Sequence, residues 1–133
     1  MTKENKGKVF VYGTLKIGGR LAPPFNEVRL SSTKGTIQGK LYNVPGAWFP
    51  AVKLGGEDVV HGELHEFDKF SEVLARMDRM EGYREEDHTH SLYLRKEAEV
   101  ITVTGEKEIA FVYEFNREVP EDARVMSGDW PIE

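Results

Sequence analysis

The chain has 133 residues, which is room for one domain of the usual size of ~150 residues and excludes two. Its 18 Lys and Arg against 23 Asp and Glu give a net charge of −5 with no basic block, which argues against nucleic acid as a partner. Apolar residues make up 39% of the chain, enough for a core, and the absence of cysteine excludes disulfides, thiolate metal sites and a cysteine nucleophile.

The chain begins with a polar, lysine-rich stretch. We expect residues 1–7 to be disordered and residues 1–133 to form a single domain. The stretch lacks the apolar centre of a secretory signal, and no apolar run approaches the ~18 residues of a membrane span. A cytoplasmic protein without a membrane partner is therefore expected.

The first half of the chain is predicted to consist of β-strands. A run of β-branched and aromatic residues between two glycines predicts a buried strand over residues 8–12. The glycines and prolines within residues 13–24 exclude a regular element there and indicate a functional loop. Alternating apolar residues and turn residues predict further strands over residues 28–32, 35–44, 51–54 and 59–67, with turns at 33–35 and 55–58.

One helix and a long hairpin complete the predicted fold. Apolar residues recur at helical spacing over residues 71–80, with Asp68 as the expected N-cap and Gly82 as the left-handed residue that ends the helix. Strands are expected over residues 89–104 and 107–115, the second buried on both faces from Ile109 to Tyr113. Six or seven strands with one helix favour an α+β fold, a small mixed β-barrel or strongly curled sheet.

Three side chains on one predicted strand could bind a metal ion. His61, Glu63 and His65 alternate, so they point to the same face and can in principle converge on a metal. A half-exposed strand requires the same alternation of polar and apolar residues, with the polar ones in solvent. We favour this second interpretation and expect no metal site.

Two further features could carry chemistry. The loop Tyr12-Gly13-Thr14-Leu15 directly follows a buried strand, and its glycine lets backbone N–H groups turn toward an anion such as a carboxylate. Glu81 falls in the last helical turn, where the helix dipole disfavours a carboxylate. Burial there would raise its pKa toward neutrality and suit it to accept and return a proton. Taken alone, the two features are better explained by an ordinary glycine turn and a surface glutamate.

A series of short motifs resembles the gamma-glutamylcyclotransferase-like family, most closely its gamma-glutamylamine cyclotransferase branch. The motifs occur in the family's order along nearly the whole chain: Val9-Phe10-Val11-Tyr12-Gly13-Thr14-Leu15-Lys16, Gly39-Lys40-Leu41-Tyr42, Phe49-Pro50-Ala51-Val52, Val60-His61-Gly62-Glu63-Leu64, Met77-Asp78-Arg79-Met80-Glu81-Gly82-Tyr83, Tyr93-Leu94-Arg95, Ala110-Phe111-Val112-Tyr113 and Gly128-Asp129-Trp130. Each motif is short, and their common order makes the resemblance specific.

The resemblance implies a small barrel whose cavity holds a γ-glutamyl substrate, with no cofactor. The loop Tyr12 to Leu15 would hold the glutamyl head, with Thr14 where other members have serine, and Glu81 would act as base and then as acid. The substrate's own α-amine would attack its γ-carbonyl and release 5-oxoproline and a free amine. Asp78 also fits the family's pattern, and we expect a capping or structural role for it. Tyr113 is expected either in the cavity wall or in the core.

Several alternatives stay open at this point. The same fold could be a non-catalytic barrel that binds a small molecule or a partner, or a metal-dependent barrel using the histidine strand. The loops 16–26 and 44–50 are expected to read the amine side of the substrate, and the cations Lys16 and Arg20 could favour an acidic leaving group. The oligomeric state is left undetermined.

Overall fold

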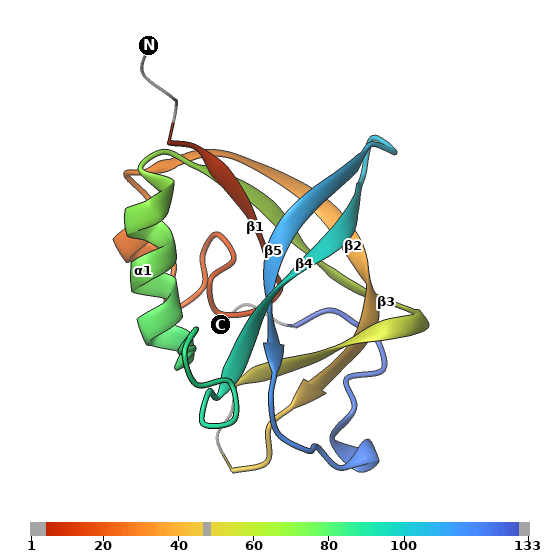
Figure 1. Ribbon diagram of the computed structural model, residues 1–133. Coiled ribbons are helices and arrows are strands. Elements are labelled where there is room, and N and C mark those ends of the chain that lie inside the picture. The colour runs from red at the N-terminus through yellow and green to blue at the C-terminus, as the bar shows by residue number, and fades with distance from the viewer. Residues whose placement is uncertain (1–4, 47–48, 131–133) are drawn as a thin grey trace.

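The computed structural model describes residues 5–46 and 49–130. Their strands close into a five-stranded barrel in the order β1-β3-β2-β4-β5, and helix α1 lies beside the barrel (Figure 1). The elements are β1 (Gly7–Val11), β2 (Arg29–Asn43), β3 (Pro50–Phe67), α1 (Phe70–Glu81), β4 (Tyr93–Thr102) and β5 (Lys107–Phe115), with short 3-10 helices at Pro23–Phe25 and Glu121–Ala123. The predicted α+β class, a small β-barrel with one main helix, is confirmed.

The barrel closes through one parallel contact. β1 runs parallel to β5 where Val9 faces Phe111, and the other neighbouring strands pair antiparallel. The strand pair β2 and β3 extends over most of both strands and forms the long wall of the barrel. The closing contact joins the middle of β1 to the middle of β5, and the loop after β1 starts two residues beyond it.

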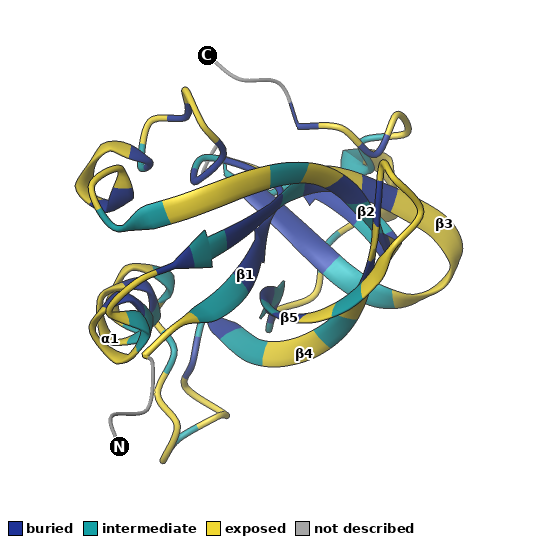
Figure 2. Cartoon of the chain, turned by 90° about the horizontal axis from the view of Figure 1, so that it is seen from above, coloured by how far each residue is buried: buried dark blue, intermediate teal, exposed yellow. Residues whose placement is uncertain are grey.

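The core has two parts, one inside the barrel and one between the barrel wall and α1 (Figure 2). Phe10, Leu41 and Val60 are buried in the inner part. Val73 and Met77 are the buried residues of α1 and pack in the outer part, which also contains residues of β1, β3, β4 and β5. A strand that lies between the two parts of the core contacts one part with each face and therefore needs apolar residues on both faces. This explains the unbroken apolar run at the end of β1.

The turn predicted at residues 33–35 is wrong, because β2 continues through it. Thr33 pairs with Leu64 of β3, and Gly35 pairs with both Gly62 of β3 and Thr102 of β4. A Cβ atom on Gly35 would lie 2.9 Å from the carbonyl oxygen of Ile101. This glycine therefore marks a close approach of β4 to β2 and not a reversal of the chain.

The turn predicted at residues 55–58 is a bulge within β3. Gln38 pairs with Val59 and its neighbour Gly39 pairs with Leu54, so the four residues between the two partners are an insertion in the ladder. Gly55 has a φ of 102° there, and the strand continues in the same direction beyond it. Two pairs of predicted strands are thus one strand each, which reduces the expected six or seven to five.

The helix agrees with the prediction except at its start. α1 begins one residue earlier and ends one residue later than expected, and Gly82 has the predicted left-handed conformation with a φ of 67°. The N-cap is Lys69, at a φ of 51°, and not Asp68, whose Oδ1 instead accepts the Lys69 N–H at 2.9 Å. The polar side chain thus stabilises the left-handed residue before the helix.

The final hairpin is shorter than predicted and less buried. β4 starts at Tyr93, because the preceding residues form a turn in which the Ser91 hydroxyl donates to the carbonyl oxygens of Arg84 and Asp87. β5 has the predicted bounds, but its outer face is not fully buried, since Ile109 is 59% exposed. The apolar pattern of β5 predicts more burial than the structure has, because α1 covers only part of the barrel.

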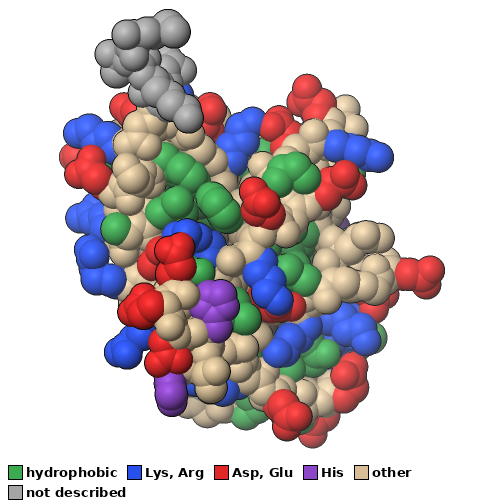
Figure 3. Space-filling model, viewed as in Figure 1, with side chains coloured by type: hydrophobic (Ala, Val, Ile, Leu, Met, Phe, Trp, Pro, Cys, Tyr) green, Lys and Arg blue, Asp and Glu red, His purple; other side chains and the backbone are tan. Residues whose placement is uncertain are grey.

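The N-terminal segment and the surface complete the description. Asn5 accepts the N–H of Phe70 and exchanges side-chain hydrogen bonds with Ser71, and Gly7 begins β1, so residues 5–7 belong to the fold. Residues 1–4, the rest of the segment expected to be disordered, lie outside the described residues. Basic and acidic side chains are interspersed over the face in Figure 3. Within residues 5–46 and 49–130 no helix is long and apolar enough to cross a membrane.

Candidate active site

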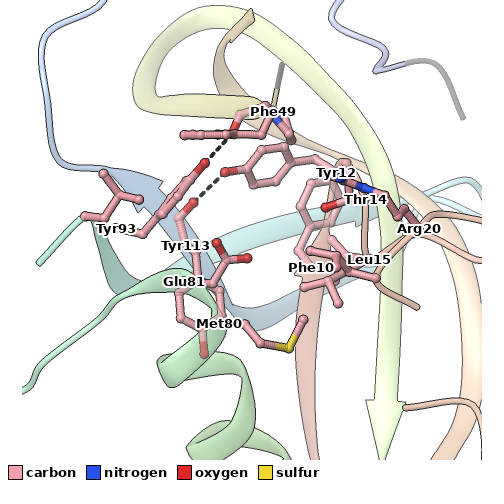
Figure 4. Close-up of a pocket in the computed structure, with 15 residues that line it drawn as sticks. Phe10, Tyr12, Thr14, Leu15, Arg20, Phe49, Met80, Glu81, Tyr93 and Tyr113 are labelled. Atoms are coloured by element: carbon pink, nitrogen blue, oxygen red, sulfur yellow. Dashed lines mark hydrogen bonds between the residues drawn. The ribbon is translucent and has the colours of Figure 1, made fainter. Parts of the chain in front are cut away.

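A cavity of about 170 Å³ lies where the loop after β1 meets the end of α1 (Figure 4). It is lined by Phe10, Val11, Tyr12, Gly13, Thr14, Leu15, Arg20, Leu21, Phe49, Pro50, Met80, Glu81, Leu92, Tyr93 and Tyr113. All the site residues predicted from the sequence, the loop Tyr12 to Leu15 with Glu81 and Tyr113, are among them. Its wall is largely apolar, and its two charged side chains are Arg20 and Glu81.

The loop after β1 is held in a tight turn. The Lys16 N–H donates to the carbonyl oxygen of Gly13 at 3.0 Å, and the Leu21 N–H donates to that of Thr14 at 2.9 Å. Among the described residues no acceptor takes the N–H groups of Thr14 and Leu15, and both residues line the cavity. Such groups can hold the carboxylate that the sequence predicts.

Two further contacts fix the end of this loop. The buried Lys16 ammonium, 5% exposed, donates to the Trp130 carbonyl oxygen at 2.6 Å and pairs with Asp129 at 3.3 Å. The Ile17 N–H donates to Oε1 of Glu63 at 2.9 Å. Lys16 therefore fastens the loop to the C-terminal segment and does not line the cavity, which removes it as a candidate for reading the leaving group. Arg20 does line the cavity and remains a candidate for recognising the leaving group.

The glycine of the loop is required by a close approach. A Cβ atom on Gly13 would lie 2.2 Å from Cγ of Pro50, the first residue of β3, whereas the Gly13 backbone has no positive φ. The sequence predicts that this glycine serves the turn of the backbone. The finding is that it lets the loop pack directly on the proline ring, which fixes the cavity wall on that side.

Replacement of Gly13 by alanine is expected to displace the loop or Pro50, since both are rigid. We expect a loss of about 1–3 kcal/mol in stability, typical of overpacking, together with a higher KM for the substrate. Gly105→Ala is the control: it strains a residue with a φ of 89° at the opposite end of the β4–β5 hairpin. The control should lower the urea midpoint and leave KM unchanged, and an unchanged KM in Gly13→Ala would contradict this role.

Glu81 is the last residue of α1, and the helix end fixes its position. The Tyr83 N–H donates to the carbonyl oxygen of Asp78 at 2.8 Å and the Gly82 N–H to that of Arg79 at 3.3 Å, the bonds of a Schellman motif. The Glu81 carboxyl group points into the cavity (Figure 4). No hydrogen-bond donor of the described residues reaches it, and burial raises its pKa from 4.5 to about 7. A carboxyl group with this pKa can take up and release a proton near neutral pH.

Three tyrosines form the polar part of the wall around Glu81. The Tyr12 hydroxyl donates to the carbonyl oxygen of Tyr113 at 2.7 Å, and the Tyr93 hydroxyl donates to that of Pro50 at 2.5 Å (Figure 4). Burial, with a contribution from the Glu81 charge, raises the pKa of each tyrosine above its usual value. Tyr93 was not predicted as a site residue. It lies at the start of a strand, where an aromatic residue normally signals only core packing.

Asp78 has the structural contacts expected for it. Its Oδ1 accepts the Tyr113 hydroxyl proton at 2.7 Å, and its Oδ2 accepts from the Arg95 guanidinium at 2.6 Å. The guanidinium lies over the rings of Tyr83 and Phe111, at 5.2 and 5.1 Å from their centroids. This network joins the last turn of α1 to β4 and β5, so it fixes the helix end that carries the glutamate.

The histidine strand has no geometry for a metal. His65 Nε2 lies 2.9 Å from Oε1 of Glu63, and Arg29 donates to His65 Nδ1 at 3.2 Å, whereas His61 lines a separate groove. In the part of the chain that the structure describes, no group of three His, Asp or Glu side chains could hold a metal ion. The expected solvated outer face is wrong for His65, which is 0% exposed and whose pKa is lowered mainly by burial.

Solved structures of other proteins share this fold. YkqA from Bacillus subtilis superposes with a TM-score of 0.69 at 23% identity, over 94% of this chain and 39% of that one, so the present chain corresponds to part of YkqA. An AIG2-like protein from Mus musculus superposes with a TM-score of 0.66 at 21% identity, over 88% of this chain and 82% of that one. At these identities the similarity establishes the barrel fold.

Sequence comparison identifies the family. The family model "Gamma-glutamyl cyclotransferase, AIG2-like" matches residues 9–131. A gamma-L-glutamyl-butirosin B gamma-glutamyl cyclotransferase from Niallia circulans is 32% identical over 134 residues, which cover 97% of this chain and 81% of that protein. The chain belongs to the gamma-glutamyl cyclotransferase, AIG2-like family, so the resemblance predicted from its motifs is confirmed at the level of the family.

Proposed function

We propose that this protein is a gamma-glutamylcyclotransferase that releases 5-oxoproline and a free amine from a γ-glutamyl amine or a related small γ-glutamyl amide. The observation that carries the proposal is a carboxyl group with a pKa of about 7, Glu81, in the same small cavity as Thr14 and Leu15, whose backbone N–H groups have no acceptor among the described residues. Membership of the family and the cyclotransferase from Niallia circulans support the type of reaction.

The reaction needs no nucleophile from the protein. The substrate's α-ammonium gives a proton to the Glu81 carboxylate, and the freed amine attacks the γ-carbonyl carbon to close a five-membered ring. The protonated Glu81 then donates to the leaving nitrogen as the original C–N bond breaks, and the carboxylate so regenerated takes the second proton that the ring nitrogen must lose to become an amide. 5-Oxoproline and the amine depart, and Glu81 gives this proton to the amine or to solvent. Ring closure within one molecule supplies several kcal/mol if the substrate is held curled. Holding the α-carboxylate at the N–H groups of the loop would impose that shape.

The amine side of the substrate lies toward the mouth of the cavity. Phe49 and Pro50 line one side of it and Arg20 the loop side, while residues 47–48 lie outside the described residues. Arg20 is exposed and forms part of the wall, so it could pair with an acidic group of the substrate. A largely apolar wall suits the carbon chain of an amine leaving group.

The test is a screen of γ-glutamyl compounds with 5-oxoproline as the readout. It should include γ-glutamyl-ε-lysine, γ-glutamyl dipeptides and glutathione, each with and without a strong chelator. We expect release of 5-oxoproline from at least one γ-glutamyl amine, at a rate that the chelator leaves unchanged. Binding without release from any compound would favour the non-catalytic barrel, and a rate abolished by the chelator would contradict the proposed acid–base mechanism.

A further inference from the structure

One residue of β3 contacts both ends of the loop after β1. The backbone of Glu63 pairs with Val11, the last residue of β1. Its side chain holds the other end, because Oε1 accepts the N–H of Ile17 at 2.9 Å. The five residues between these two points, Tyr12 to Lys16, include all the loop residues proposed to bind the substrate. Glu63 therefore closes the loop, although it is not among the residues that line the cavity.

The glycine before Glu63 allows this arrangement. A Cβ atom on Gly62 would lie 2.4 Å from the carbonyl oxygen of Val11. Any larger residue would push β1 away from β3 at the point where the loop begins. The pair Gly62-Glu63 thus fixes the start of the loop by a close backbone approach and its end by a hydrogen bond.

His65 holds the carboxyl group of Glu63 in place. It lies on the same face of β3 and is fully buried. The Nε of Arg29 can only donate, so its contact with Nδ1 of His65 at 3.2 Å makes Nδ1 an acceptor. The proton of the neutral ring is then on Nε2, which donates to Oε1 of Glu63 at 2.9 Å. A ring with protons on both nitrogens would set two donors against each other at Arg29, so these contacts require the neutral form.

Oε1 of Glu63 consequently accepts two hydrogen bonds, one from the histidine and one from the loop. Two donors at one oxygen restrict the rotation of the carboxyl group, and a polar network with its hydrogen bonds satisfied makes its surroundings more rigid. Only 13% of the Glu63 side chain is exposed, so water competes weakly for this oxygen. The contacts form a continuous chain from Arg29 of β2 through His65 and Glu63 to Ile17 of the loop.

We propose that Glu63, oriented by His65, is a positioning residue that keeps the loop Tyr12 to Leu15 in the shape that binds the substrate. This rests on the proposed function, in which the N–H groups of the loop hold the substrate's carboxylate. An ordered loop loses little conformational entropy when a ligand binds, whereas a loose loop must first be brought into the binding shape. The proposal assigns a role to two of the three alternating residues of β3.

The test compares Glu63→Ala with Glu63→Gln. Alanine removes the acceptor, whereas glutamine keeps one oxygen that can take both hydrogen bonds. NMR order parameters of the Thr14 and Leu15 amides measure the order of the loop, and an NMR titration measures the affinity for added 5-oxoproline. Loss of a hydrogen bond to a charged group makes the binding shape about tenfold rarer, so Glu63→Ala should lower the order parameters and weaken 5-oxoproline about tenfold. Glu63→Gln should stay within about threefold of the wild-type affinity.

Two results would overturn the proposal. One is an unchanged loop order and affinity in Glu63→Ala, because the hydrogen bond to Ile17 would then have no part in shaping the loop. The other is an equal loss in Glu63→Gln and Glu63→Ala, because the charge of Glu63 and not its accepting oxygen would then be responsible.

The kinetic constants provide a readout that a general loss of stability would not produce. The substrate is the γ-glutamyl compound that gives the highest rate in the screen. Glu63→Ala should raise KM about tenfold and leave kcat within about threefold, since Glu81 is unaltered. A lower kcat with an unchanged KM would overturn the proposal.

Asp87→Ala is the matched control. The carboxyl group of Asp87 also contacts a backbone N–H and a histidine ring, both of His90, at 3.3 and 2.8 Å. These contacts lie in the turn before β4, and neither residue lines the cavity. The variant should keep the wild-type loop order, affinity and KM. A loss as large as that of Glu63→Ala would overturn the proposal, because loss of any such carboxylate would then disturb the loop.

The part played by His65 is tested on the wild-type protein. The nitrogen NMR resonances of its ring near neutral pH should show a neutral imidazole with the proton on Nε2. A proton on Nδ1, or on both nitrogens, would overturn the proposal, and this measurement stands even if Glu63→Ala fails to fold. In a folded Glu63→Ala protein the Nε2 proton should lose its protection from exchange.

The order parameters and the titration do not depend on turnover, so this inference and the proposed function can fail separately. Loss of loop order and of 5-oxoproline binding in Glu63→Ala, without release of 5-oxoproline from any γ-glutamyl compound, would support the positioning role and refute the proposed reaction. Turnover by the wild-type protein, with unaltered loop order and affinity in Glu63→Ala, would refute the positioning role alone.

Discussion

Replacing Glu81 by glutamine is expected to lower kcat by roughly 10²–10⁴-fold, the usual contribution of a general acid–base group. Glutamine keeps the size of the side chain but cannot accept a proton from the substrate amine or return one to the leaving nitrogen. The measurement is the rate of 5-oxoproline release, together with the affinity for added 5-oxoproline. That affinity should stay close to the wild-type value, since the N–H groups of the loop are unaltered.

The control for this variant is Glu85→Gln, which makes the same change at an exposed position beyond the end of α1. It should retain wild-type kcat. Substantial turnover in Glu81→Gln would refute the assignment of Glu81 as the base. A loss of product binding in the same variant would indicate that the cavity had been disturbed, and the loss of rate would then carry no information on proton transfer.

The dependence of the rate on pH follows from the same group. Glu81 must be ionised to accept a proton, and its pKa is about 7 in the folded protein. The kcat/KM of the wild-type protein should therefore fall as the pH is lowered through about 7. A glutamate with an ordinary pKa would keep its activity down to about pH 5, so the position of this acid limb distinguishes the buried carboxyl group from an exposed one.

The second large effect is on stability. The pKa of Glu81 is about 7 in the folded state against 4.5 for an unperturbed glutamate, so the folded protein binds this proton more tightly than the unfolded chain. The contribution of Glu81 to stability is fully present below about pH 4.5 and is lost as the pH rises to about 7 and beyond. The difference between these two pKa values corresponds to a loss of on the order of 3 kcal/mol in the free energy of unfolding.

Glu81→Gln removes this titration, so the variant should gain stability relative to the wild-type protein as the pH rises. We expect the difference in free energy of unfolding to shift by on the order of 3 kcal/mol in favour of the variant between pH 4.5 and pH 8. Urea unfolding of both proteins at the two pH values measures the shift. A difference that is independent of pH would mean that Glu81 titrates normally. If the shift is found, the wild-type protein gives up stability for a carboxylate that can work as a base.

The fold could be predicted from the sequence where a glycine ends an element. It could not be predicted where a glycine lies inside a strand. β1, α1 and β5 were found close to their predicted bounds because local periodicity and the glycine after α1 determine them. The glycines at 35 and 55 were interpreted as turns, although one allows β4 to approach and the other lies in a bulge. Both uses depend on a neighbouring strand that is distant in sequence, so no local pattern distinguishes them from turns.

The residues of the candidate site also include some that could be predicted from the sequence and some that could not. Glu81 and the loop after β1 could be predicted because the motifs that contain them resemble those of a known family. Their positions alone, against the helix dipole and after a strand at a glycine, favoured a surface glutamate and an ordinary turn. Tyr93 could not, because its place in the cavity wall depends on a hydrogen bond from its hydroxyl to the carbonyl oxygen of Pro50, 43 positions away in the sequence. Lys16 looked like an exposed cation, and only its contact with the C-terminal segment showed that it is buried.

The parallel closure of the barrel has a consequence for the order of events in folding. The hydroxyl of Tyr12 meets the carbonyl oxygen of Tyr113 across 101 positions of the sequence, and the Lys16 ammonium meets that of Trp130 across 114. Contacts of such long range form late and slow a chain's folding, because the loop they close must first lose its freedom. The cavity wall and the loop beside it therefore need residues from both ends of the described chain, and a chain emerging during synthesis has no complete site until Tyr113 and Trp130 are available.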